Sequence, residues 1–271
     1  MKRNSLLFFI LLSIAIGVEY ELSSLSDLEL STGKYLELLS SFLLLSIYII
    51  PICAMLVIYA KRWKVPKYII PLSIVSGAYG TGWLAGYGND YLLEGLKRLL
   101  GSSKALEAWS AALTAPFVEE TLKLCCGLII LYLLKRKNSQ SAFVVGASVG
   151  LGFQIIEDIS YIIEAAQDSF QTVVPKTLER ISGGISSHWS LTCIFTVAVI
   201  CILSKTQLNN KSKWLWLVFP ITMHFIWNSP INDLPLISTV ISAVTIMIII
   251  QMITFIEANQ KNQHQQVRVF K

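Results

Sequence analysis

The chain has 271 residues, of which 54% are hydrophobic and only 14% are charged, and its formal net charge is +5. So apolar a composition cannot supply the polar surface of a soluble protein of this length, and it predicts a protein that crosses a lipid bilayer several times. Basic residues do not cluster with aromatic ones, so nucleic acid is not an expected partner.

Eight apolar segments have about the length that a helix needs to cross the hydrocarbon of a bilayer. In chain order they cover residues 5–18, 36–60, 68–88, 108–134, 141–163, 183–203, 214–228 and 236–256. The first also has the basic start and apolar run of a signal peptide, and its cleavage stays an open alternative. Segment 91–110 places charges between apolar residues at helical spacing, which predicts a helix lying along the outer membrane surface.

The basic residues are unevenly distributed between the connecting segments. With the N-terminus in the cytoplasm, the cytoplasmic segments hold 15 of the 22 Lys and Arg residues and the outer loops hold 6. This bias predicts an integral membrane protein with both termini in the cytoplasm. The expected location is a bacterial plasma membrane. The predicted fold is all-α and polytopic, with about eight transmembrane helices and a polar site within the bundle. Residues 1–107 hold the first three spans, 108–230 the catalytic core, and 231–271 the last span and a polar tail.

Ionisable side chains are concentrated in four consecutive spans, the fourth to the seventh. A charged group in hydrocarbon costs several kcal/mol unless it is paired or hydrated, so such residues are usually functional. The polar residues at membrane depth are Glu119, Glu120, Lys123, Glu157, Asp158, His188, His224 and Asn228.

Their depth in the membrane follows from the helical rise. At about 1.5 Å per residue, Glu119, Glu157 and His188 lie about 24 to 26 Å from the cytoplasmic boundary. Asn228 lies at about 22 Å and His224 lowest, at about 16 Å. These values predict one polar layer in the outer half of the bilayer.

Helical spacing predicts which side chains share a face. Lys123 follows Glu119 by four residues and Glu120 by three, so it can neutralise either carboxylate. The two adjacent glutamates point about 100° apart, so one is expected to face the site and the other to contact a neighbouring helix.

In the fifth span, Phe153 and Glu157 also share a helix face. Gly146 and Gly150 form a small-xxx-small pattern, which permits close helix packing and is expected to bring Glu157 toward the fourth span.

These residue types permit hydrolysis of a carbonyl compound. A glutamate beside a histidine can activate water, and a histidine or asparagine side chain can donate a hydrogen bond to the developing oxyanion. The same side chains could instead hold zinc, with Glu157, His188 and His224 as candidate ligands and water in the fourth position. No HExxH motif is present, so mechanisms with and without a metal stay open.

Four motifs carry a resemblance to a known family. The ordered set "APFVEETLK", "GLGFQIIED", "SSHWSLT" and "MHFIWN" resembles the PrsW family of intramembrane proteases, which is similar to the CAAX-protease and bacteriocin-processing group. The resemblance implies peptide-bond hydrolysis of a membrane-protein or peptide substrate near the membrane surface, by a glutamic-type or metalloprotease mechanism.

By position, the resemblance also implies roles for single residues. The implied roles are water activation by Glu119 and Glu120, substrate binding or polarisation by Glu157 and His188, oxyanion stabilisation by His224 and Asn228, and support by Lys123, Phe153 and Asp158. Asp158 departs from the family pattern, in which many sequences have Asn. A proton- or ion-coupled transporter, or an inactive member acting as a membrane interaction or immunity protein, is the alternative function, and the oligomeric state is open.

Overall fold

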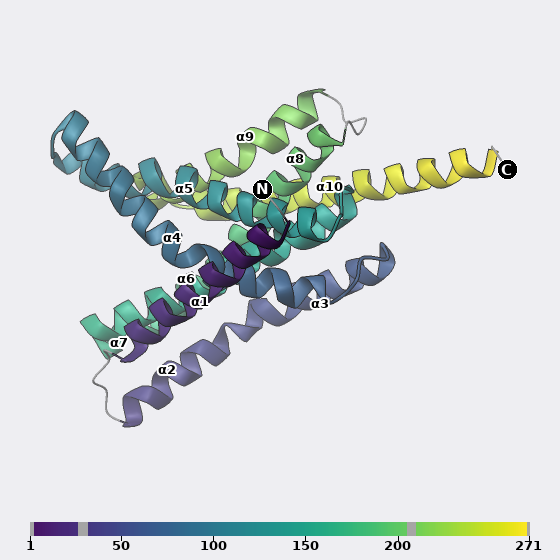
Figure 1. Ribbon diagram of the computed structural model, residues 1–271. Coiled ribbons are helices and arrows are strands. Elements are labelled where there is room, and N and C mark those ends of the chain that lie inside the picture. The colour runs from purple at the N-terminus through teal and green to yellow at the C-terminus, as the bar shows by residue number, and fades with distance from the viewer. Residues whose placement is uncertain (1–2, 27–31, 205–209, 270–271) are drawn as a thin grey trace.

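The computed structural model describes residues 3–26, 32–204 and 210–269, and every regular element in these ranges is helical (Figure 1). The elements are α1 (Arg3–Ser26), α2 (Thr32–Leu44), α3 (Ser46–Arg62), α4 (Ile69–Leu100), α5 (Lys104–Leu133), α6 (Ser139–Asp168), α7 (Phe170–Gly184), α8 (His188–Leu203), α9 (Asn210–Trp227), the 3-10 turn η1 (Pro230–Asp233) and α10 (Ile237–Val269). The predicted all-α class is confirmed.

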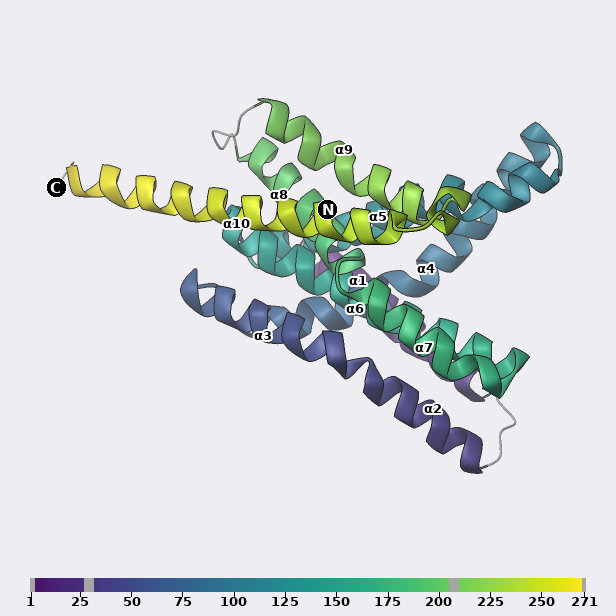
Figure 2. The ribbon, with the colours of Figure 1, turned by 180° about the vertical axis from the view of Figure 1, so that it is seen from behind.

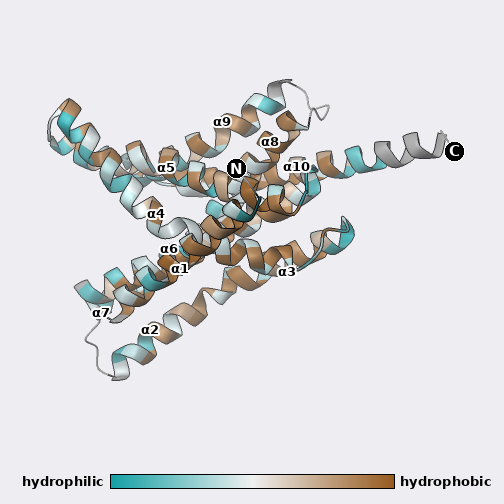
Figure 3. Ribbon diagram, viewed as in Figure 1, coloured by the Kyte–Doolittle hydropathy of each residue, from teal (hydrophilic) through white to brown (hydrophobic). Residues whose placement is uncertain are grey.

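Helix α6 lies at the centre of the bundle, with α4 on one side and α8 on another. Helix α5 packs against α4, α6 and α9, while α2 and α3 contact α6 and α7. The most apolar stretch of α6 is 83% buried, against 17% for that of α1, so α6 is an interior helix and α1 is peripheral. Hydrophobic residues fill the middle of most helices and hydrophilic ones gather near their ends, as expected for helices that cross a bilayer (Figure 3).

The helices run alternately in the two directions across the molecule. In Figure 1, α1, α4 and α6 end toward the left, whereas α3, α8 and α10 end toward the right. Within the described ranges, five stretches, in α1, α2–α3, α6, α7–α8 and α10, are long and apolar enough to cross a membrane. The other three predicted spans form α4, α5 and α9, so each predicted span has a helical counterpart. Their orientation in the membrane stays a prediction.

Two predicted spans are broken helices. Segment 36–60 divides at Leu45 into α2 and α3, and segment 183–203 divides between Gly184 and His188. Adjacent glycines at 183 and 184 weaken a helix, and Ser187 begins α8 as its N-cap residue. Helix α7, which precedes this break, occupies a stretch that was predicted to be an outer loop, and it lies beside α2 in Figure 2.

Segment 91–110 is not a separate surface helix. Its first half continues α4 to Leu100, and its second half begins α5. The chain turns at Gly101, whose φ of +76° suits glycine, and the Ser103 hydroxyl caps α5 by accepting a hydrogen bond from Leu106 N at 3.1 Å. The helical periodicity was therefore correct, but it belongs to the ends of two long helices.

Glycines in α6 let the backbones of neighbouring helices come into contact. A Cβ atom at Gly150 would lie 2.3 Å from the His188 carbonyl oxygen of α8, and one at Gly152 would lie 2.0 Å from the Ile74 carbonyl oxygen of α4. The expectation that Gly146 and Gly150 face the fourth predicted span was wrong, because both pack against α8. This contact brings the start of α8, and with it His188, against α6.

Candidate active site

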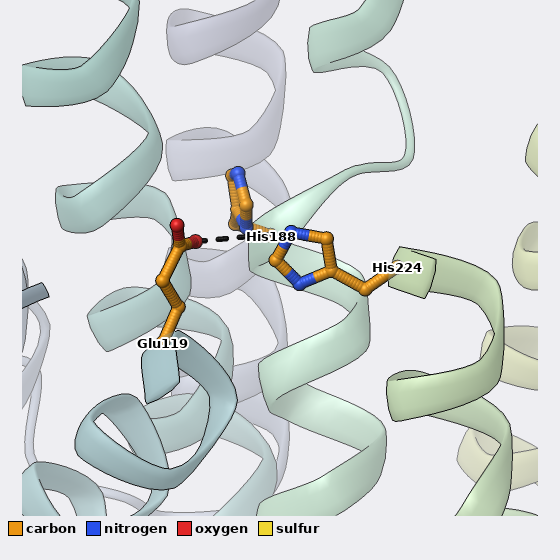
Figure 4. A group of neighbouring side chains, drawn as sticks. All are labelled: Glu119, His188 and His224. Atoms are coloured by element: carbon orange, nitrogen blue, oxygen red, sulfur yellow. Dashed lines mark ion pairs between the residues drawn. The ribbon is translucent and has the colours of Figure 1, made fainter. Parts of the chain in front are cut away.

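The polar side chains of four helices converge inside the bundle. Helix α5 contributes Glu119, Glu120 and Lys123, α6 contributes Glu157, and the histidines come from α8 and α9. Figure 4 shows the Glu119 carboxylate and the two imidazole rings directed toward one another from three helices. The predicted polar layer therefore corresponds to a real cluster of neighbouring side chains.

Lys123 is fully buried and is the cation at the centre of the cluster. Its Nζ lies 2.7 Å from Glu120 Oε1 and 3.6 Å from Glu119 Oε2, so it pairs with both carboxylates, as the helical spacing predicted. Lys123 also donates to His188 Nδ1 at 2.8 Å, and its Nζ lies 4.1 Å from the centre of the Phe153 ring. Phe153 stacks edge-on against His188 and so forms an apolar wall beside the charges.

Glu119 and Glu120 have different surroundings. Glu120 is fully buried, accepts a hydrogen bond from Thr192 Oγ1 at 3.2 Å, and lies 3.2 Å from His224 Nδ1. Glu119 accepts a hydrogen bond from Asn89 Nδ2 at 3.1 Å through Oε1, but its buried Oε2 has no hydrogen-bond partner. Glu120 is thus held in place, whereas Glu119 keeps one oxygen available.

His188 links this inner group to a second group of charges nearer the surface. Because Lys123 donates to Nδ1, the proton of the neutral ring is on Nε2, which donates to Glu157 Oε2 at 3.0 Å. The guanidinium of Arg180 pairs with Glu157 and with Asp158. Asp158 also accepts a hydrogen bond from Tyr48 at 2.7 Å. The structure therefore separates Asp158 from the histidines and places it in a supporting network.

The site carries more negative than positive charge. Two cations face four carboxylates, which leaves an excess of two negative charges in a mostly buried region. Such an excess needs compensation, either by protonated histidines or by a divalent cation. The charged residues in this count are Glu119, Glu120, Glu157, Asp158, Lys123 and Arg180.

Glu119, His188 and His224 have the arrangement and the chemistry that a metal ion requires. One ligand atom from each residue lies within 4.8 Å of the others, and two imidazoles with one carboxylate suit zinc. The Nδ1 atom of the neutral His224 ring donates to Glu120, so its Nε2 carries no proton. This nitrogen lies 3.8 Å from Glu119 Oε2, and neither of the two atoms can donate to the other. These residues fit the ion, although Lys123 would compete with it for His188 Nδ1.

This set differs in one member from the set predicted from the sequence. Glu157 was a predicted ligand, but its Oε2 is engaged by Arg180 and by His188 Nε2. Glu119, whose Oε2 makes no hydrogen bond and lies 3.6 Å from Lys123 Nζ, takes its place.

A polar cavity of about 240 Å³ adjoins the cluster. It reaches Glu157, His188 and Asn228 but not the inner carboxylates, so His188 belongs both to the cavity wall and to the group around Glu119. Asn228 therefore lies near the cluster, in the wall of the cavity. The other lining residues come from α6, α7, α9, η1, α10 and the connection before α8: Tyr161, Glu179, Arg180, Ser182, Gly183, Ser187, Trp227, Asn232 and Ser238.

Sequence reasoning missed three residues of this region. Arg180 was assigned to an outer loop, Asn89 lies outside the four motifs, and Thr192 ends the motif "SSHWSLT" but was given no role, because single amides and hydroxyls are common in helices. A signal for Arg180 was available, since two adjacent carboxylates at 157 and 158 require a counter-charge. For the other two, only the tertiary contacts with Glu119 and Glu120 reveal a role.

Comparison with known families assigns the chain to a family. The family model described as PrsW family intramembrane metalloprotease matches residues 66–256, which is more than half of the chain. The chain therefore belongs to the PrsW family and is an intramembrane protease by family. The match extends beyond the four motifs to α4, which supplies Asn89. Comparisons with curated proteins and with solved structures gave no match.

Proposed function

We propose that this PrsW-family member is an endopeptidase that hydrolyses a peptide bond of a membrane-associated protein near the outer membrane face. The observation that carries the proposal is the convergence of Glu119, His188 and His224 behind a polar cavity. A buried carboxylate oxygen that makes no hydrogen bond, next to an unprotonated imidazole nitrogen, is an arrangement that can accept a proton from water.

Glu119 is the proposed water-activating carboxylate. Its Oε2 is buried without a hydrogen-bond partner and faces His224 Nε2, so a water between them would meet two acceptors. Glu120 is less suited to this step because Lys123, Thr192 and His224 already occupy its oxygens. We assign Glu120 to holding Lys123 and His224 in place.

The substrate carbonyl is proposed to lie in the cavity beside His188. Asn228 lines the cavity, and its side-chain amide can donate to the developing oxyanion. The oxyanion role that the resemblance implied for His224 passes to Asn228, since His224 is directed to the two glutamates. Glu157 accepts a hydrogen bond from the Nε2–H group of His188 and thereby keeps the other ring nitrogen, Nδ1, directed inward.

A metal ion, if bound, would be held by Glu119, His188 and His224. Such an ion polarises a carbonyl and lowers the pKa of a bound water. The excess of two negative charges in the site supports binding of a divalent cation. Lys123 and Asn89 would then keep the two glutamates in position.

The cavity suits an unwound substrate segment rather than an intact helix. A peptide bond must be freed from its helix before it can be attacked, and its polar groups then need partners. Ser182, Ser187, Asn232 and Ser238 line the cavity and can supply them. The substrate class is therefore a single-pass or membrane-associated protein with an extended segment next to the membrane, on the side that the charge distribution predicts to be outer.

The test uses purified protein in detergent micelles and a set of single-pass substrates with cleavable segments next to the membrane. We expect Glu119→Gln to lower the cleavage rate by about 10²- to 10⁴-fold, the usual contribution of a general base. Glu94→Gln removes a carboxylate from an exposed ion pair with Arg98 and should cleave as wild type does. If Glu119→Gln and Glu120→Gln both retain wild-type cleavage, the proposal is wrong.

A further inference from the structure

We infer that Arg180 is a positioning residue of this site, which acts on the reaction by holding Glu157 where it orients His188. The inference rests on the proposed function and adds a residue that lies outside the four family motifs. Arg180 belongs to α7, and its side chain is only 17% exposed. It lines the polar cavity, so it lies at the border between the substrate space and the buried charges.

The guanidinium of Arg180 makes two ion pairs at once. Its Nη2 contacts Glu157 Oε2 and its Nε contacts Asp158 Oδ1, and the group lies 4.5 Å from the centre of the Tyr161 ring. A planar fork of fixed donors can bridge two neighbouring carboxylates in this way, whereas a lysine ammonium acts as a single point charge. The Tyr48 hydroxyl donates a hydrogen bond to the other oxygen of Asp158, so the carboxylate that Arg180 Nε contacts is itself held in position.

Arg180 is coupled to His188 through one shared atom. Glu157 Oε2 accepts from both Arg180 Nη2 and His188 Nε2, so the position of that oxygen decides the orientation of the imidazole. Without Arg180, two adjacent carboxylates would face each other with no cation between them, and Glu157 would turn toward the water of the cavity. His188 would then lose the acceptor of its Nε2–H group, which orients the imidazole ring.

The position of Arg180 in the chain also affects where His188 lies. It lies one helical turn before Gly184, where α7 ends and the chain breaks before α8 begins at His188. By tying α7 to α6, Arg180 also fixes the point from which the broken segment leads to the histidine. Both effects act on the same residue, and neither requires contact with the substrate.

The test is the kinetics of Arg180→Gln in the cleavage assay described above. We expect kcat to fall about 10- to 100-fold, as is usual when a partner that orients an active-site histidine is lost, with KM changed less than about twofold. Arg180→Lys should recover little of kcat, because an ammonium cannot bridge both carboxylates. The matched control is Lys176→Gln, which removes a cation from an exposed ion pair one turn earlier on α7 and should leave both constants unchanged.

Two further variants keep the inference testable if Arg180→Gln fails to fold. Asp158→Asn combined with Arg180→Gln removes the more buried of the two carboxylates that would be left without a cation, and it should fold but retain the low kcat. In Arg180→Ala, millimolar guanidinium should restore kcat in a saturable way, because the vacated space opens onto the cavity.

Wild-type kcat in either Arg180→Gln background would overturn the inference, and so would a raised KM with unchanged kcat, which would indicate substrate binding. If the wild-type protein cleaves and Glu119→Gln does not, these results reject the role of Arg180 alone. If the wild-type protein cleaves none of the substrates, the proposed function fails and the inference fails with it.

Discussion

Replacing Lys123 with methionine should destabilise the protein more than any other single change of charge in the bundle. The methionine keeps the length of the side chain but removes the cation that lies 2.7 Å from Glu120 and 2.8 Å from His188. Lys123 and Glu120 are both fully buried, so the carboxylate would stay in the interior without its counter-charge. Removing one partner of a buried pair costs about 3 to 5 kcal/mol, and we expect a loss of that size.

A double variant separates the loss of the ion pair from the loss of packing. Lys123→Met combined with Glu120→Gln removes the carboxylate that lies nearest to the lost cation, and the amide can still accept from Thr192. Glu119, at 3.6 Å from Nζ, is then the one carboxylate of this pair that loses its counter-charge. We expect the double variant to recover more than half of the lost free energy of unfolding. Arg98→Met serves as the control, since its pair with Glu94 is exposed and should contribute less than about 1 kcal/mol.

The measurement is equilibrium unfolding by SDS in mixed micelles, followed through the fluorescence of the seven tryptophans. The reasoning would be refuted if Lys123→Met unfolded within about 0.5 kcal/mol of wild type, a loss that falls in the range of surface substitutions. It would be refuted equally if the double variant were no more stable than Lys123→Met, because the unpaired Glu120 would then not be the cause.

Three other predictions concern metal binding, packing and topology. The wild-type protein should contain about one divalent ion per chain by elemental analysis and Glu119→Ala should lose it, whereas full activity in metal-free protein would contradict this. Gly150→Ala should cost about 1 to 3 kcal/mol in the SDS assay, because its Cβ would lie 2.3 Å from the His188 carbonyl oxygen; an unchanged stability would show that α8 can move away. In intact cells, a cysteine at position 171 should react with an impermeant thiol reagent and one at position 138 should not, and the reverse result would invert the predicted orientation.

The composition and local spacing determined the class of the protein and much of its site. An excess of apolar residues predicts a helical membrane protein because only helices satisfy their own backbone in lipid without closing a barrel. Lys123 follows Glu119 and Glu120 by four and three residues, and a helix brings such side chains together whatever surrounds it. The depth estimate also gave Glu157 and His188 the same height as this pair, because helical rise converts residue counts into height. In the structure His188 contacts Lys123 at 2.8 Å and Glu157 at 3.0 Å.

Tertiary structure decided which of these residues face one another. Height along a helix says nothing about rotation around its axis. The sequence therefore could not show that Glu119, rather than Glu157, directs an oxygen without a hydrogen bond toward the histidines. The sequence predicted that Arg180 lies in a loop. It reaches the site only because α7 folds back along α6. The break before His188 and the backbone contact at Gly150 likewise depend on how helices pack, since contacts between distant residues are not encoded in the spacing of any one segment.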